Sequence, residues 1–200
     1  MPEIYAEWAR QVRGVHFHYL TTSPEQVARS YMEFTFSSYP HGSFDARPPS
    51  LSNIEARKSM LGRILESFPE RKFFLMADTS NTDAMQVLPQ LAKDHPGAVQ
   101  CIWLRNTTST DDSYRLGYDT TGFKGLEQSR YMFFNVPDDL RGLNITRGEC
   151  YNATVPQNLM FGPQGSLLSS DSGGVAGGRP SEWVVMMVAM VLGAILAVWC

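Results

Sequence analysis

The sequence predicts an α/β domain built on a Rossmann-like parallel sheet with helices on both faces. Three observations support this fold class. Short apolar runs, typical of strands buried on both sides, occur at residues 15–20, 73–77, 99–104 and 131–134. Amphipathic helical patterns lie between most of them, and the connections are short. Because strands that alternate with helices pair in parallel, a sheet covered on both faces follows.

The elements can be assigned in chain order. Ile4, Trp8 and Val12 recur at helical spacing, so a first helix is expected over residues 4–12, closed by Gly14. A strand follows, and Pro24 at a first helical position predicts a helix to about residue 31.

Residues 39–52 are rich in Pro, Gly and Ser and are interpreted as a loop. The second half of the predicted sheet then alternates regularly. Helices are expected over residues 57–68 and 84–93, and strands over 73–77, 99–104 and 131–134.

Polar residues follow the predicted strands at their carboxyl ends. Asp78 comes directly after the run 73–77, and Asp83 lies five residues further on. Ligands bind at this edge of a parallel sheet, and two carboxylates suit Mg²⁺. The alternative is that Asp78 or Thr79 caps a helix beginning near Ala84. Other predicted strands also end in polar groups, which favours the metal–phosphate interpretation; these groups are Thr21, Ser23, Arg105 and Asn106.

Composition and motifs exclude several function classes. The net charge of −3, without a basic stripe, argues against nucleic-acid binding. No Gly-rich phosphate loop or Gly-x-Ser-x-Gly motif is present, which argues against nucleotide binding and serine-hydrolase chemistry. His16 and His18 face one side of their strand and are expected to be structural.

The second half of the chain carries features of secreted proteins. Three Asn-x-Thr sequences, at Asn106, Asn144 and Asn152, are acceptors for N-linked glycans. Cys101 and Cys150 could pair in an oxidising compartment, although Cys101 could equally be a buried free thiol. The chain opens without a signal peptide, which conflicts with a lumenal second half.

The C-terminal part predicts a membrane tether. Residues 167–182 form a Ser/Gly-rich linker, and residues 183–199 are continuously apolar, predicting a hydrophobic helix. This helix is either a transmembrane anchor or the tail of a glycolipid-anchor signal with attachment at Ser172 or Gly173. A tail-anchored cytosolic protein is a third alternative. The predicted location is a membrane, at the cell surface or in the secretory lumen rather than the cytosol.

Four stretches, at residues 17–24, 39–44, 68–73 and 77–83, together resemble the catalytic domain of the fungal actin-patch-type phosphatidate phosphatases, within the haloacid-dehalogenase superfamily. The similarity covers residues 1–136, and residues 137–166 would be a C-terminal extension. The resemblance implies Mg²⁺-dependent hydrolysis of phosphatidate or another phosphomonoester through an aspartyl-phosphate.

Carried onto this chain, the resemblance implies a role for five residues. Thr21 would hydrogen-bond the phosphoryl oxygen, and Asp78 and Asp83 would hold Mg²⁺. The basic residue before the acidic strand would be Arg57 by an ungapped match or Lys58 by residue type. Ala77 stands where the family usually has Gly, a mild departure.

The larger departure concerns the nucleophile, because no Asp-x-Asp-x-Thr motif follows an apolar run. We expect either an N-terminal truncation or a product that has lost catalysis, and we predict that the chain as written does not hydrolyse a phosphoester. The rival interpretation is a catalytically dead, membrane-tethered binding or structural module at the cell surface.

Overall fold

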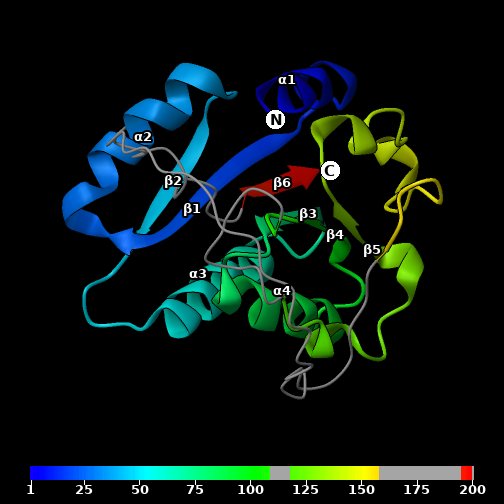
Figure 1. The fold of residues 1–200 in the computed structure, drawn as a ribbon. Helices are drawn as coiled ribbons and strands as arrows, with labels where there is room; N and C mark the ends of the chain where they lie inside the picture. Colours follow the sequence, from blue (N-terminus) through cyan, green and yellow to red (C-terminus); the bar gives the residue numbers. More distant parts are fainter. Residues whose placement is uncertain (109–117, 158–194, 200) are drawn as a thin grey trace, which may run out of the picture.

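The computed structural model describes residues 1–108 and 118–157 with their side chains, and the backbone of residues 195–199. Helices cover both faces of one six-stranded sheet, so the predicted α/β architecture is confirmed (Figure 1). Among the described residues, no helix is long and apolar enough to cross a membrane.

The sheet is parallel except at its centre. Its strand order is β2 (Gly42–Arg47), β1 (His16–Pro24), β6 (Ile195–Trp199), β3 (Lys72–Asp78), β4 (Val99–Arg105) and β5 (Tyr131–Phe134). β1 pairs in parallel with β2, and β3, β4 and β5 pair in parallel in series. β6 runs antiparallel to both of its neighbours, β1 and β3, and joins the two parallel groups.

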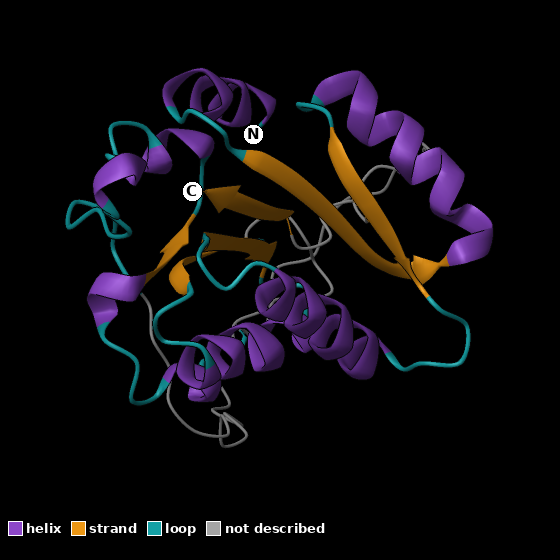
Figure 2. Cartoon of the chain, turned by 180° about the vertical axis from the view of Figure 1, so that it is seen from behind, coloured by secondary structure: helices purple, strands orange, loops and turns teal. Residues whose placement is uncertain are grey.

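The helices form two layers, one on each face of the sheet (Figure 2). They are α1 (Pro2–Gln11), α2 (Glu25–Ser38), α3 (Asn53–Ser67) and α4 (Thr82–Asp94). α3 and α4 pack on one face, and α1 packs on the other together with residues that follow β5. The residues that follow β5 include two short 3₁₀ helices, η4 (Pro137–Leu140) and η5 (Ile145–Arg147). Two more 3₁₀ helices precede β5, namely η2 (Thr121–Phe123) and η3 (Gln128–Arg130).

Side chains alternate between two apolar cores along each central strand. In β3, Phe73 and Leu75 join the core under α3 and α4, whereas Phe74 and Met76 join the core under α1. Trp103 is fully buried and stacks on Phe74, with ring centroids 5.4 Å apart. Burial on both faces explains why these strands are continuous apolar runs in the sequence.

Three expectations about elements are corrected. The predicted loop at residues 39–52 contains edge strand β2, and the helix expected to end near residue 31 continues to Ser38. Of the predicted hydrophobic helix at 183–199, residues 195–199 form strand β6, whose backbone groups pair with β1 and β3. Residues 183–194, the linker and the anchor positions Ser172 and Gly173 lie outside the described residues.

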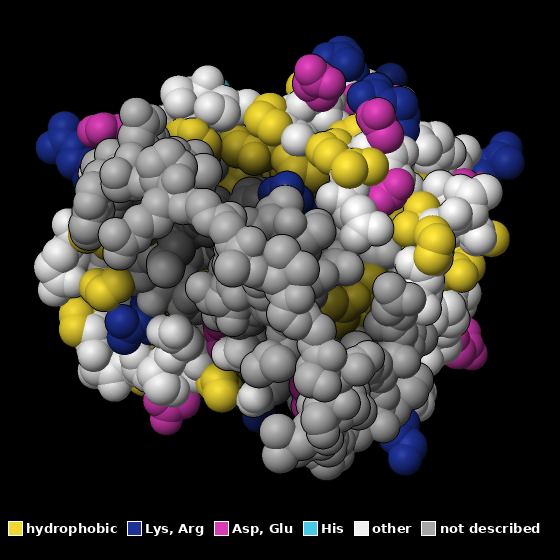
Figure 3. Space-filling model, viewed as in Figure 1, with side chains coloured by type: hydrophobic (Ala, Val, Ile, Leu, Met, Phe, Trp, Pro, Cys, Tyr) yellow, Lys and Arg dark blue, Asp and Glu magenta, His cyan; other side chains and the backbone are white. Residues whose placement is uncertain are grey.

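Charged side chains of both signs are visible on the face shown in Figure 3. Among the described residues visible there, Lys and Arg side chains lie interspersed with acidic ones.

Candidate phosphate and metal site

The carboxyl ends of β1 and β3 form the candidate site. β6 lies between them, and its residue Ile195 pairs with Tyr19 of β1 and Met76 of β3. Thr21 lies two residues after Tyr19, and Asp78 lies two residues after Met76. Both therefore project beyond the first residue of β6 by the same length of strand. Since neighbouring strands lie about 4.8 Å apart, the two strand ends are separated by about 10 Å.

Asp78 is held in a tight turn at the end of β3. Its Oδ1 accepts hydrogen bonds from the backbone N–H of Ser80 (3.1 Å), from the Ser80 hydroxyl and from Nδ2 of Asn81 (2.8 Å). Burial raises the pKa of this carboxyl, while these hydrogen bonds and the charge of Arg57 oppose the rise.

The helix-cap alternative for Asp78 and Thr79 is wrong. α4 begins at Thr82, its N-cap position is Asn81, and no side chain caps it. We did not predict from the sequence that Ser80 and Asn81 donate hydrogen bonds to Asp78. An Asp whose side chain accepts from the backbone two residues later forms an Asx-turn, for which Asp is a known sequence signature.

Arg57 projects from α3 and is fully buried. Its Nε donates to Oδ2 of Asp83 at 2.6 Å, forming a buried ion pair. Its two terminal nitrogens, Nη1 and Nη2, are also buried and have no hydrogen-bond partner in the described part of the chain. Buried donors are normally paired. The two terminal nitrogens of this guanidinium are therefore available to donate hydrogen bonds, and their spacing matches that of two oxygens of a phosphate.

Lys58, the alternative basic residue, is exposed on the same helix and forms no such pair. The structure therefore places Arg57, and not Lys58, beside the acidic residues. The charge of Arg57 also acts on Asp78, where it partly opposes the rise in the pKa of that carboxyl that burial causes.

The two carboxylates retain oxygens that could hold a metal ion. Both side chains are buried, and the hydrogen bonds described above fall on Asp78 Oδ1 and Asp83 Oδ2. Mg²⁺ commonly binds one or two carboxylates together with substrate phosphate, so this donor set fits. In the described ranges no third acidic, His or Cys side chain completes a larger cluster.

The end of β1 presents a hydroxyl to the same edge. Thr21 Oγ1 accepts a hydrogen bond from the N–H of Ser23 at 3.1 Å, which leaves its own proton to donate. Arg47 of β2 fixes the following turn by donating from Nε to the Thr22 carbonyl at 2.7 Å.

The end of β4 completes the edge. Arg105 is the register partner of Asp78, and its Nε is buried without a hydrogen-bond partner among the described residues. Asn106 follows it, and its Oδ1 accepts hydrogen bonds from the N–H (3.0 Å) and the hydroxyl (2.8 Å) of Thr108. Thr79 is buried between the two strands, and its Oγ1 accepts from the N–H of Thr107 at 3.1 Å.

The remaining candidate residues lie elsewhere. Cys101 of β4 and Cys150 form a disulfide, with Cα atoms 5.3 Å apart. Asn144 and Asn152 lie in the segment after β5.

The two histidines of β1 contact residues of the neighbouring strand β2. His16 contacts the Ser43 hydroxyl at 2.6 Å, and His18 Nε2 lies 3.1 Å from Asp45. Burial lowers the pKa of His18.

Comparison with known families identifies the domain. The family model described as "Phosphatidate phosphatase APP1, catalytic domain" matches residues 1–106, which is more than half of the chain. The chain belongs to this phosphatidate phosphatase family. The matched region of the phosphatase domain includes α1 to β4 and therefore Thr21, Arg57, Asp78 and Asp83. No curated protein and no solved structure gives a significant match.

Proposed function

We propose that the strand ends of this phosphatidate phosphatase-type domain bind a phosphomonoester, such as the phosphatidate headgroup, together with Mg²⁺. The observation that carries the proposal is Arg57. A fully buried guanidinium with two unpartnered nitrogens is costly unless a ligand satisfies it, and a phosphate dianion does so with two parallel hydrogen bonds.

Each residue at the edge has a role in this proposal. Arg57 binds two phosphate oxygens, and the Thr21 hydroxyl donates to a third from the end of β1. Asp78 and Asp83 would hold Mg²⁺, which when bound supplies positive charge to the phosphoryl oxygens. Asp83 also fixes the guanidinium of Arg57 through the 2.6 Å hydrogen bond to Nε. Positioning and charge stabilisation of this kind are most of what phosphoryl transfer requires.

We further propose that the chain in this arrangement binds without cleaving. The resemblance implies an aspartate nucleophile on a strand, whereas the strand between β1 and β3 is β6, with the apolar sequence Ile-Leu-Ala-Val-Trp. The same observation favours a second candidate function, in which the domain is a phosphate-binding or structural module without turnover.

Binding can be tested by calorimetry on the full-length chain with inorganic phosphate, in the presence and absence of Mg²⁺. Arg57→Leu should weaken phosphate binding about 10- to 150-fold, since hydrogen bonds to charged groups contribute about 1.5–3 kcal/mol. Lys58→Leu, a matched change one residue away on the exposed side of α3, should leave the affinity unchanged. Equal weakening by the two variants would contradict the assignment of Arg57.

Turnover is tested separately, by phosphate release from phosphatidate vesicles. We expect binding and no release. Mg²⁺-dependent release that Asp78→Asn abolishes would instead show an enzyme and remove the module interpretation.

A further inference from the structure

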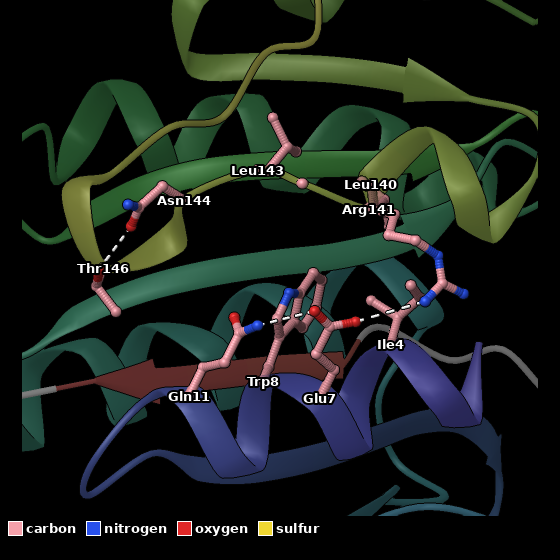
Figure 4. Close-up of a pocket in the computed structure, with 10 residues that line it drawn as sticks. Ile4, Glu7, Trp8, Gln11, Leu140, Arg141, Leu143, Asn144 and Thr146 are labelled. Atoms are coloured by element: carbon pink, nitrogen blue, oxygen red, sulfur yellow. Dashed lines mark hydrogen bonds and ion pairs between the residues drawn. The ribbon is translucent and has the colours of Figure 1, made fainter.

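A polar groove of about 400 Å³ lies on the sheet face opposite α3 and α4, between α1 and the segment 140–146 (Figure 4). Glu7, Trp8 and Gln11 line it from α1, and Arg141, Asn144 and Thr146 line it from the other side. Arg141 lies 3.7 Å from Glu7 at one end. At the other end, Asn144 and Thr146 stand across from Gln11. None of these residues belongs to the phosphate site.

Asn144 is held in a conformation that leaves its amide nitrogen available. Its Oδ1 accepts hydrogen bonds from the Thr146 hydroxyl at 2.6 Å and from the N–H of Arg147 at 3.2 Å. No hydrogen bond from Asn144 Nδ2 occurs among the described residues. A sugar linked to Nδ2 would therefore leave both existing hydrogen bonds in place.

The disulfide supplies an independent observation about the compartment. Cys101 and Cys150 are buried, and the indole N–H of Trp103 donates to the Cys150 carbonyl at 2.8 Å, which holds this part of the chain against β4. The Cα separation of 5.3 Å is ordinary for a disulfide. Disulfides persist in oxidising compartments, and those compartments are where Asn-x-Thr sequences receive glycans.

We propose that Asn144 carries an N-linked glycan whose first sugars lie in this groove, and that the domain matures in the secretory pathway. The groove suits a sugar because Glu7, Gln11 and Arg141 offer charged and amide groups to its hydroxyls. The proposal does not depend on phosphate binding, because it rests on the opposite face of the sheet.

The other two acceptor sequences differ from Asn144 in position. Asn106 Oδ1 is held much as Asn144 Oδ1 is, by hydrogen bonds from the Thr108 N–H (3.0 Å) and hydroxyl (2.8 Å). Asn106 follows Arg105 at the carboxyl end of β4, so a glycan there would stand over the phosphate site. Asn152 already uses Nδ2 to donate to the Asp139 carbonyl at 3.2 Å. Neither lines the groove.

The test uses the full-length chain purified from the organism that encodes it, with variants introduced at its own locus. Digestion with peptide N-glycosidase should increase gel mobility. This shift should be smaller or absent in Asn144→Gln and Thr146→Ala, and undiminished in Thr146→Ser, which retains the acceptor hydroxyl, and in Asn152→Gln. Amide hydrogen exchange in residues 2–11 should be slower before digestion than after it, because the sugars cover α1.

No mobility shift, or a shift of undiminished size in both Asn144→Gln and Thr146→Ala, would overturn glycosylation at this site. Labelling of Cys101 and Cys150 by a thiol reagent in the unfolded chain before reduction would overturn maturation in an oxidising compartment. Exchange in α1 that is unchanged by digestion would overturn docking of the sugars in the groove.

Discussion

Replacing Asp83 by asparagine should expose the cost of the buried charge on Arg57. The guanidinium is fully buried, and Asp83 is its ion-pair partner in the described structure. Removing one member of a buried pair typically costs about 3–5 kcal/mol, because the other charge is left uncompensated. For a chain of this size, about 2–4 °C of melting temperature corresponds to each kcal/mol, so Asp83→Asn should melt about 6–20 °C below the unmodified protein.

The double variant Arg57→Met/Asp83→Leu separates this explanation from general damage to the core. Replacing a buried ion pair by apolar residues of similar volume is often neutral or stabilising. The double variant should therefore unfold closer to the unmodified protein than Asp83→Asn does. Thermal and urea unfolding followed by circular dichroism would measure both. The reasoning is refuted if Asp83→Asn costs less than about 1 kcal/mol, or if the double variant is destabilised further than the single one.

Three further predictions concern stability. Because burial raises the pKa of Asp78 above its ordinary 3.8, the folded state holds this proton more tightly than the unfolded state does. Stability should therefore fall as pH rises from 3.8 through the raised pKa, and Asp78→Asn should flatten this part of a melting-temperature profile; an unchanged slope would argue against it. Loss of the disulfide in a Cys101→Ala/Cys150→Ala variant should cost about 4 kcal/mol in urea unfolding, from the loop entropy of a 49-residue separation. Equal urea midpoints for the oxidised parent protein and the variant would show that the disulfide does not stabilise the fold. Gly42→Ala would place a Cβ 2.0 Å from the Phe17 carbonyl oxygen, so it should cost at least about 1–3 kcal/mol, or prevent β2 from pairing, in the same assay. A variant as stable as the parent would show that β2 does not approach β1 this closely.

Sequence alone predicts the central strands because burial on both faces leaves a simple signal. The run at residues 73–77 is such a case, and it becomes β3. Edge strand β2 gives no comparable signal, since its residues are half-buried or exposed and include Ser43, Asp45 and Arg47. Its pairing with β1 decides its structure, and pairing between distant residues cannot be seen in a local pattern.

In the candidate site, too, some features can be predicted from a local sequence pattern and others cannot. The acidic pair is predictable from its position after an apolar run, but choosing between Arg57 and Lys58 requires the rotation of α3. Arg57 lies at the centre of the face formed by Met60, Leu61 and Leu65, and Lys58 lies at its flank, so helical periodicity already indicates which of the two is buried. Strand β6, at residues 195–199, could not be predicted from periodicity, because an unbroken apolar run fits a buried strand as well as a helix.

The position of β6 has a consequence for how the protein folds. Residues 195–199 supply the hydrogen-bonding bridge between the β2–β1 pair and the β3–β4–β5 group, although more than a hundred residues of chain separate them from β3. Contacts this distant in sequence form late and slowly, since a long loop must close before they stabilise anything. The two groups of strands should therefore assemble first as separate halves, and closure of the sheet should be the slow step of folding.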